Sequence, residues 1–164
     1  MERVPVVTND GIYGFFGEFR YLSNFHLCNV QTADGLVFSS SEAAYMAQKT
    51  IDPEIRRSFL WLPPAEARRL GQTITLRTDW DVFRVVAMYD VVLRKFSQNQ
   101  NLRVLLNATG NKYLEESNNW SDNFWGYDPV SAIHGWGEKD STGNMLGKIL
   151  VSVRDYLRHP HFSA

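Results

Sequence analysis

Residues 39–50 read Ser-Ser-Ser-Glu-Ala-Ala-Tyr-Met-Ala-Gln-Lys-Thr, a run of hydroxyl residues followed by good helix formers. Ser39-x-x-Glu42 fits a capping box, a pattern that marks the first turn of a helix. At about 100° per residue, Glu42 and Lys49 fall on one helical face, roughly two turns or about 10 Å apart. This separation is too long for an ordinary ion pair along a helix, and it leaves room for a ligand between the carboxylate and the amine.

Two interpretations of this helix remain open. In the first, Tyr45 shares the face with Glu42 and Lys49, and the carboxylate and the amine act on a bound substrate. In the second, Glu42 accepts a hydrogen bond from a backbone N–H and Lys49 is solvated near the helix end. The second is the ordinary expectation for such a pattern, because capping boxes are common and active sites are few.

The composition limits the class of protein. With 164 residues and 44% hydrophobic content, the chain fits a single domain over residues 1–164 with a sizeable core. The net charge of −1 gives no overall field that attracts nucleic acid or a membrane. The lone Cys28 excludes a disulfide framework within the chain and favours a reducing compartment. With no signal pattern and no long apolar run, we expect a cytoplasmic protein without membrane contact.

Local patterns predict a helix-rich α+β fold with a small antiparallel β element near the N-terminus. Turn signals at residues 9–11 and 33–35 separate extended segments, including an aromatic stretch over residues 12–19. Helical periodicity and boundary residues predict helices over residues 53–61, 102–108 and 145–157, and another that has proline at its start, Pro63, and glycine past its end, Gly71. A longer helix is expected after a cap at Asp79. Its apolar stripe comprises Val82, Phe83, Val86, Tyr89, Leu93 and Phe96.

Two later stretches have site-like composition. Residues 114–126 place Trp120 and Trp125 among acids and amides without an amphipathic period. They form either a buried aromatic cluster under a loop or a stacking wall for a planar ring. Residues 128–143 are rich in glycine, include Trp136, and are expected to form a mobile lid.

The last predicted helix begins directly after Gly143-Asn144. Its first N–H groups are expected either to receive a phosphate or to be capped by the protein. The sequence contains no His-Glu-x-x-His, Gly-x-Ser-x-Gly or Gly-x-Gly-x-x-Gly motif, so we expect no metal and no cofactor.

Several short motifs follow one another along the chain. They are Leu22-Ser23-Asn24-Phe25, Ser41-Glu42-Ala43-Ala44-Tyr45-x-Ala47-Gln48-Lys49, Pro64-x-Glu66-Ala67-x-x-Leu70-Gly71, Asp79-Trp80-Asp81, Lys95-Phe96, Thr109-Gly110, Leu114-x-Glu116-x-Asn118-x-Trp120-x-Asp122-x-x-Trp125-Gly126 and Gly143-Asn144-x-Leu146-Gly147. Each motif alone is weak, but their order and spacing resemble the NADAR family over residues 14–158, almost the whole chain.

The resemblance implies an N-glycosidase that hydrolyses the bond between ribose and an exocyclic base nitrogen. One substrate class associated with the family is ADP-ribose on guanine in nucleic acid, which we take as the expected substrate. Such an enzyme would pair functionally with a DNA ADP-ribosyltransferase. The other class, ribosylamino-pyrimidine phosphates from early riboflavin synthesis, is a nucleotide-like small molecule and remains an alternative.

The resemblance also implies roles for individual residues. Glu42 would act as general acid and base, and Lys49 would form a Schiff base at C1′ or stabilise the opening sugar. Asp122 is the second candidate for proton transfer. The residues that match the family's substrate pocket are Asn24, Phe25, Tyr45, Gln48, Trp80, Asn118, Trp120, Trp125, Gly126, Asp128, Gly143 and Asn144.

Some features depart from the family or favour other functions. Some members carry His-Tyr where this chain has Ala43-Ala44, and many have Gln at the position of Met46, so base contacts are expected to differ. A non-catalytic module that binds NAD or ADP-ribose would keep the aromatic pocket. A nucleic-acid-binding protein would need a basic face, and the densest cluster is Arg56, Arg57, Arg68 and Arg69, which is more often solvated than bound.

Overall fold

The structure is a computed structural model that describes residues 4–128 and 143–159. The chain divides into two compact units, one formed by residues 24–105 and the other by the segments on either side of them. The boundary falls within helix α5 (Gln100–Ala108). The expectations for residues 129–142, including the lid and Trp136, lie outside the described residues.

The unit of residues 24–105 begins with a β-hairpin. Strand β3 (Leu27–Gln31) pairs antiparallel with β4 (Val37–Ser40), as predicted from the turn signal between them. Gly35 closes the turn with φ +82°, and its N–H donates to the Thr32 carbonyl over 3.0 Å. Because this φ lies in the left-handed region, glycine is the residue that adopts it without strain.

Helix α1 (Ser41–Ala47) begins directly where β4 ends, and every one of its side chains is buried. The predicted cap at Ser39 is wrong by one residue. The Ser40 hydroxyl accepts from the Ala43 N–H over 3.1 Å, whereas Ser39 lies in the strand and donates to the Leu62 carbonyl over 2.7 Å. Side chains alternate along a strand, so consecutive serines point in opposite directions and one of them faces the helix.

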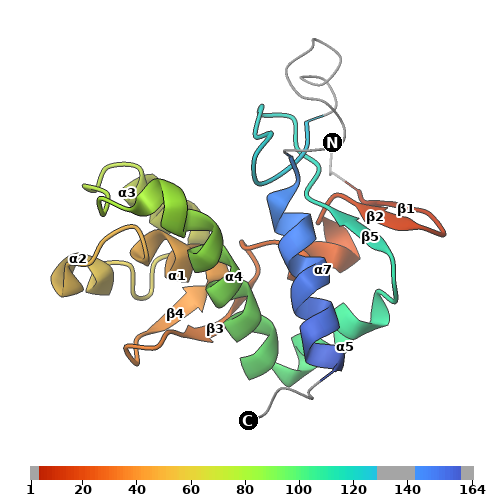
Figure 1. The fold of residues 1–164 in the computed structure, drawn as a ribbon, viewed down its shortest axis with the longest axis horizontal. Helices are drawn as coiled ribbons and strands as arrows, with labels where there is room; N and C mark the ends of the chain where they lie inside the picture. The colour runs from red at the N-terminus through yellow and green to blue at the C-terminus, as the bar shows by residue number, and fades with distance from the viewer. Residues whose placement is uncertain (1–3, 129–142, 160–164) are drawn as a thin grey trace. The chain divides into compact units, whose positions relative to one another are not determined.

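Helix α1 packs against β3, β4, α2 (Pro53–Arg57), α3 (Pro64–Gly71) and α4 (Trp80–Gln98), as Figure 1 shows in orange to green. The prediction for residues 53–61 was too long, because α2 ends at Arg57. Trp61 then adopts φ +67°, outside the helical region. Gly71, predicted to follow the next helix, is its last residue.

The buried face of α4 differs from the predicted stripe. Val82 and Val86 are 84% and 59% exposed, whereas Ala87, Met88 and Val91 are buried. The helix carries apolar residues on more than one face, and periodicity alone selected the wrong set at its start. Asp79 is the residue at the start of the helix, as predicted, but its carboxylate binds Arg77 and makes no capping bond.

The other unit contains a small sheet of order β1-β2-β5, formed by Val6–Val7, Gly11–Tyr13 and Tyr113–Glu115. Strand β1 is antiparallel to β2, and β5 pairs with β2 in parallel. The strand predicted over residues 12–19 ends at Tyr13, because Gly14 adopts φ +87° and the 3₁₀ helix η1 (Gly17–Leu22) follows. The sequence interpretation did not identify β5.

Helix α7 (Met145–Arg158) packs against β5. A Cβ atom at Gly147 would overlap the Leu114 carbonyl oxygen, so glycine permits this close approach. Arg154 donates to the Thr109 hydroxyl and the Lys112 carbonyl over 2.8 and 2.9 Å. These contacts tie α7 to the segment after α5, and the α+β, helix-rich fold class is confirmed. Within the described residues, no helix is both long and apolar enough to cross a membrane.

Candidate active site

Glu42 lies in the first turn of α1, as predicted, and its side chain is buried at 7% exposure. Its backbone N–H donates to the Asn24 carbonyl over 3.1 Å. The Asn24 side chain accepts from the Ser41 hydroxyl over 2.9 Å and donates to the Met88 sulfur over 3.2 Å. Asn24 therefore holds the start of α1, and with it the carboxylate of Glu42.

Lys49 lies in the turn after α1 and not on the helix itself, which corrects the prediction of a shared helical face. Its Nζ donates to the Gly71 carbonyl over 3.0 Å and lies 5.9 Å from the centroid of the Trp80 ring. The Trp80 ring in turn lies 5.3 Å from that of Tyr45. The amine is thus held between the end of α3 and an aromatic wall.

The charge of Lys49 responds to this environment. Burial is the main cause that lowers the pKa of its ammonium; the Glu42 carboxylate raises this pKa, and the Arg68 guanidinium lowers it. The net direction is downward, so a larger fraction of the amine is neutral than for an exposed lysine. The same interaction shows that Glu42 and Lys49 lie within electrostatic range of each other.

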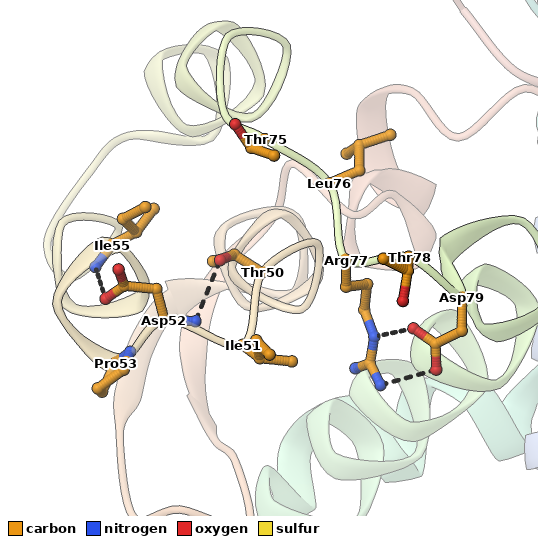
Figure 2. A pocket seen from close by; sticks show the side chains of 10 residues that line it. All are labelled: Thr50, Ile51, Asp52, Pro53, Ile55, Thr75, Leu76, Arg77, Thr78 and Asp79. Carbon is orange, nitrogen blue, oxygen red and sulfur yellow. Dashed lines mark hydrogen bonds and ion pairs between the residues drawn. The ribbon is translucent and has the colours of Figure 1, made fainter.

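A hollow of about 870 Å³ lies between the segments that follow α1 and precede α4. Its lining residues are Thr50, Ile51, Asp52, Pro53, Ile55, Thr75, Leu76, Arg77, Thr78 and Asp79. Figure 2 shows Asp52, Pro53 and Ile55 on one side and the Arg77–Asp79 ion pair on the other. The backbone N–H of Arg77 donates to the Lys49 carbonyl over 2.7 Å and so connects the two segments.

Lys49 and Trp80 are not themselves among the residues that line this hollow. Lys49 precedes the lining residue Thr50, and Trp80 follows the lining residue Asp79.

Two further predicted residues lie in this unit. Phe25 is half-buried, and Gln48 ends α1 with its side-chain oxygen accepting from Arg56 over 3.3 Å. Arg56 also binds Asp34 and the Ala47 carbonyl, both over 2.9 Å. Arg57 pairs with Glu54 at the surface. These two members of the predicted basic cluster are thus engaged within the protein.

In the other unit, Asn118 and Asp122 organise the loop that carries the tryptophans. The Asn118 side chain accepts from the Trp120 and Asp122 N–H groups over 3.2 and 3.1 Å, and donates to the Asp122 carbonyl over 2.7 Å. One oxygen of the Asp122 carboxylate accepts from the N–H groups of Phe124 and Trp125 over 3.1 and 2.9 Å. Both side chains have a structural role at these atoms.

The two tryptophans of this loop are not core residues. Trp120 is 45% exposed, and Trp125 is half-buried with its ring edge-on to Phe124 at 4.8 Å. The exposure of the Trp120 ring favours the interpretation of a stacking wall over that of a buried aromatic cluster. Nearby, the buried Asp128 carboxylate accepts from the Ser121 N–H over 3.0 Å, and a Cβ at Gly126 would overlap the Glu116 carbonyl oxygen.

Of the two expectations for the start of α7, the structure fits capping by the protein and not free N–H groups. The N–H groups of Asn144, Met145 and Leu146 donate to loop carbonyls over 2.8 to 3.0 Å. The Asn144 side chain accepts from the Glu116 N–H and donates to the Leu114 carbonyl and the Tyr113 hydroxyl. Gly143 packs closely as well, since a Cβ there would lie 3.1 Å from the Asn123 carbonyl oxygen. The protein itself caps this helix.

The structure therefore brings together Asn24, Glu42, Tyr45, Lys49 and Trp80 in one unit. The remaining predicted residues, apart from Phe25 and Gln48, lie in the other unit. Sequence reasoning missed Gly71 and Arg68 as partners of Lys49. Their motif was recognised, but no local pattern encodes a contact between residues 22 positions apart. In the part of the chain that the structure describes, no group of His, Cys, Asp and Glu side chains is arranged to hold a metal ion.

Comparison with known proteins identifies the class. The NADAR domain matches residues 9–158. An N-glycosidase of Nostoc punctiforme is 31% identical over 90% of this chain and 91% of its own length, and the N-glycosidase YbiA of Escherichia coli is 30% identical over 95% and 94%. The solution NMR structure of E. coli YbiA superimposes with a TM-score of 0.76 and 28% identity, covering 99% of this chain and 94% of that one.

A riboflavin biosynthesis protein of Vibrio vulnificus is 36% identical over 84% of this chain, which spans 35% of that protein's length. The class that emerges is an enzyme, a hydrolase of the N-glycosidase type. The chain belongs to the NADAR family.

Proposed function

We propose that this enzyme cleaves the bond between ribose and an exocyclic nitrogen of a base, and that its substrate is ADP-ribose attached to guanine in nucleic acid. The observation that carries the proposal is the buried Glu42 carboxyl group within electrostatic range of Lys49, whose ammonium has a pKa lowered mainly by burial. The hollow provides space for the part of the substrate remote from the cleaved bond.

The chemistry of such a bond suits this pair of groups. The lone pair of an exocyclic nitrogen can displace the ring oxygen from C1′, which opens the sugar to a protonated imine while the ring oxygen takes a proton from the carboxylic acid form of Glu42. The neutral Lys49 amine then adds to C1′, and the base amine leaves with one proton from the Lys49 nitrogen. Water releases the sugar from Lys49 and regenerates both groups, so the net reaction is hydrolysis.

The charge and polarity of the residues that line the hollow favour a substrate with a neutral ring. The one guanidinium of the hollow, that of Arg77, is already bonded to Asp79 over 2.5 and 3.0 Å. Ile51 and Leu76 add exposed apolar surface from the two segments. Such walls suit a neutral ring and its sugar better than a phosphate, because no unpaired cation among the lining residues meets the anion. The adenosine end of ADP-ribose has this character.

The remaining site residues are part of the proposal. Tyr45 and Trp80 would form the wall against which the reacting sugar lies, and Asn24, Phe25 and Gln48 would shape the same pocket. In the other unit, Asp122 is the second candidate for proton transfer through its second carboxylate oxygen. The proposed binding residues there are Asn118, Trp120, Trp125, Gly126 and Asp128.

A second candidate substrate is a ribosylamino-pyrimidine phosphate. The observation in its favour is that relatives from Vibrio vulnificus and Zea mays carry names of riboflavin biosynthesis proteins. Both substrates carry ribose on an exocyclic nitrogen, so the same cluster would serve either. We further propose that the enzyme acts in the cytoplasm and pairs functionally with a DNA ADP-ribosyltransferase.

The test is a comparison of the two substrates. Purified enzyme is incubated with an oligonucleotide that carries ADP-ribosyl-guanine and, separately, with the pyrimidine phosphate, and release of the base is followed by chromatography. Wild-type release from the oligonucleotide, lost in Glu42→Gln and retained in Glu66→Gln, is the expected result. Glu66 is a matched control because it is also a first-turn glutamate, on α3, but exposed.

Other outcomes are equally informative. Release from the pyrimidine alone would overturn the guanine proposal and favour the second candidate. Unchanged release by Glu42→Gln would contradict the role of this carboxylate. Tight binding of ADP-ribose without any product would indicate a non-catalytic binding module.

The covalent step has its own test. Borohydride added during turnover reduces an imine to a stable amine, and mass spectrometry should then find the sugar adduct on the peptide that contains Lys49. Lys49→Arg should lose both the adduct and turnover, because a guanidinium stays protonated. Full turnover by Lys49→Arg would exclude the Schiff base.

A further inference from the structure

The Lys49 amine is held by the end of a different helix. Its Nζ donates to the carbonyl of Gly71, the last residue of α3, over 3.0 Å. The last carbonyls of a helix have no partner within the helix and carry partial negative charge. A lysine that bonds to such a carbonyl directs one N–H toward it, and in the neutral amine the lone pair then points elsewhere.

The distance between α3 and α1 depends on the absence of a side chain at Gly71. A Cβ atom there would overlap the Met46 sulfur and lie 3.1 Å from the Met46 Cβ. Gly71 is not among the residues with positive φ, so the requirement is for space and not for backbone freedom. A larger residue would push the end of α3, and the carbonyl that binds Lys49, away from α1.

Arg68 lies one turn before Gly71 on α3 and is half-buried. Its positive charge lowers the pKa of Lys49, in the same direction as burial, whereas Glu42 on α1 acts in the opposite direction. From α4, the Trp80 ring faces the amine and stabilises its charged form weakly. Arg68 therefore counteracts the effect of the Glu42 carboxylate on the pKa of Lys49.

We propose that the last turn of α3, from Arg68 to Gly71, is the positioning element of Lys49: the Gly71 carbonyl fixes the place of the nitrogen, and Arg68 places a positive charge one helical turn away from that carbonyl. The catalytic consequence rests on the proposed function of Lys49, but the effect on the amine itself does not. Neither residue needs to touch the substrate, so both act through Lys49.

Arg68 is tested through the titration of Lys49. The rate at which Lys49 reacts with a small acylating reagent is measured across pH by peptide mass spectrometry, which needs no substrate. Arg68→Gln should shift the midpoint of this profile to higher pH, and Arg68→Lys should retain the wild-type midpoint. Arg57→Gln is the matched control, since it removes an equal charge from the neighbouring helix α2.

The same variants are then compared in single turnover. Arg68→Gln should lower the rate at neutral pH and recover it at higher pH, in step with the labelling profile. An unchanged labelling midpoint in Arg68→Gln would overturn the role of Arg68. A shifted midpoint in an enzyme without activity on either substrate would instead overturn the proposed function and leave the positioning role intact.

Gly71 is tested by relief of the steric conflict. Gly71→Ala should reduce the single-turnover rate by about tenfold or more, because a displacement of about 1 Å is costly at a reacting centre. Met46→Ala added to this variant removes the sulfur and should restore a large part of the rate, whereas Met46→Ala alone should retain turnover. Circular dichroism verifies that each variant is folded.

Two results would contradict the role of Gly71. The first is a full rate in Gly71→Ala. The second is a folded double variant that remains as slow as Gly71→Ala, because the conflict with Met46 would then not explain the loss.

Discussion

Asn144 provides a direct test of the contacts that stabilise the unit outside residues 24–105. It has left-handed backbone geometry with φ 58° and ψ 38° immediately before α7. Its side chain accepts from the Glu116 N–H over 3.0 Å, and donates to the Tyr113 hydroxyl over 2.9 Å and the Leu114 carbonyl over 2.8 Å. One buried amide thus connects the start of α7 to β5 and to the residue that follows it.

The expected cost of Asn144→Ala follows from these contacts. The variant loses three hydrogen bonds, each worth about 1 kcal/mol, and leaves the backbone groups of residues 114 and 116 without this partner. Asparagine tolerates left-handed geometry better than alanine, which adds about 1 kcal/mol. We expect a loss of about 4 kcal/mol in the free energy of unfolding. Asn144→Gly loses the same bonds without the backbone strain and should lose about 3 kcal/mol.

The assay is equilibrium unfolding in urea, with the free energy extrapolated to water. Asn101→Ala is the control, because Asn101 is exposed on α5 and its replacement should change the free energy of unfolding by less than about 0.5 kcal/mol. A loss below about 1 kcal/mol in Asn144→Ala would refute the assignment of the three bonds. Equal losses for alanine and glycine would refute the contribution of the backbone.

Three further outcomes are expected. Lys49→Met should abolish turnover yet raise the free energy of unfolding at pH 7, because the folded state disfavours the ammonium. This gain should shrink as the pH rises from the lowered pKa of Lys49 in the folded state toward its unfolded value of about 10.4, because the wild type then loses the buried positive charge. Urea unfolding at several pH values measures the change. Gly147→Ala should lose about 2 kcal/mol or more in the same assay, because its Cβ overlaps the Leu114 carbonyl oxygen, whereas the exposed Ser152→Ala should lose little. Trp120→Ala should change stability by less than about 0.5 kcal/mol but raise KM if the exposed ring stacks on substrate.

The hairpin and the helix that follows it could be predicted because their signals are local. A glycine turn fixes the hairpin, and a run of hydroxyl residues caps the helix. Local sequence does not determine whether Ser39 or Ser40 caps the helix. The choice depends on which serine the strand directs toward the helix start, and on the Leu62 carbonyl that accepts from the other one.

The α4 stripe and strand β5 show a second limit. Val82 and Val86 fit the helical period as well as Met88 and Val91 do, but packing selects one set. Strand β5 has three residues, and it is a strand because β2, about a hundred positions earlier, pairs with it. A segment this short carries too little pattern for its partner to be inferred.

The candidate site was predictable in its residue types and not in its geometry. Glu42 lies where the helix start places it, and any sequence that keeps the Ser40 cap keeps this position. Lys49 follows the helix end, so helical geometry does not fix the direction of its side chain; the carbonyl of Gly71 does. Substitutions on α3 should therefore alter the reactivity of Lys49 more than substitutions at the C-terminal end of α1, a result that inspection of the lysine motif alone would not suggest.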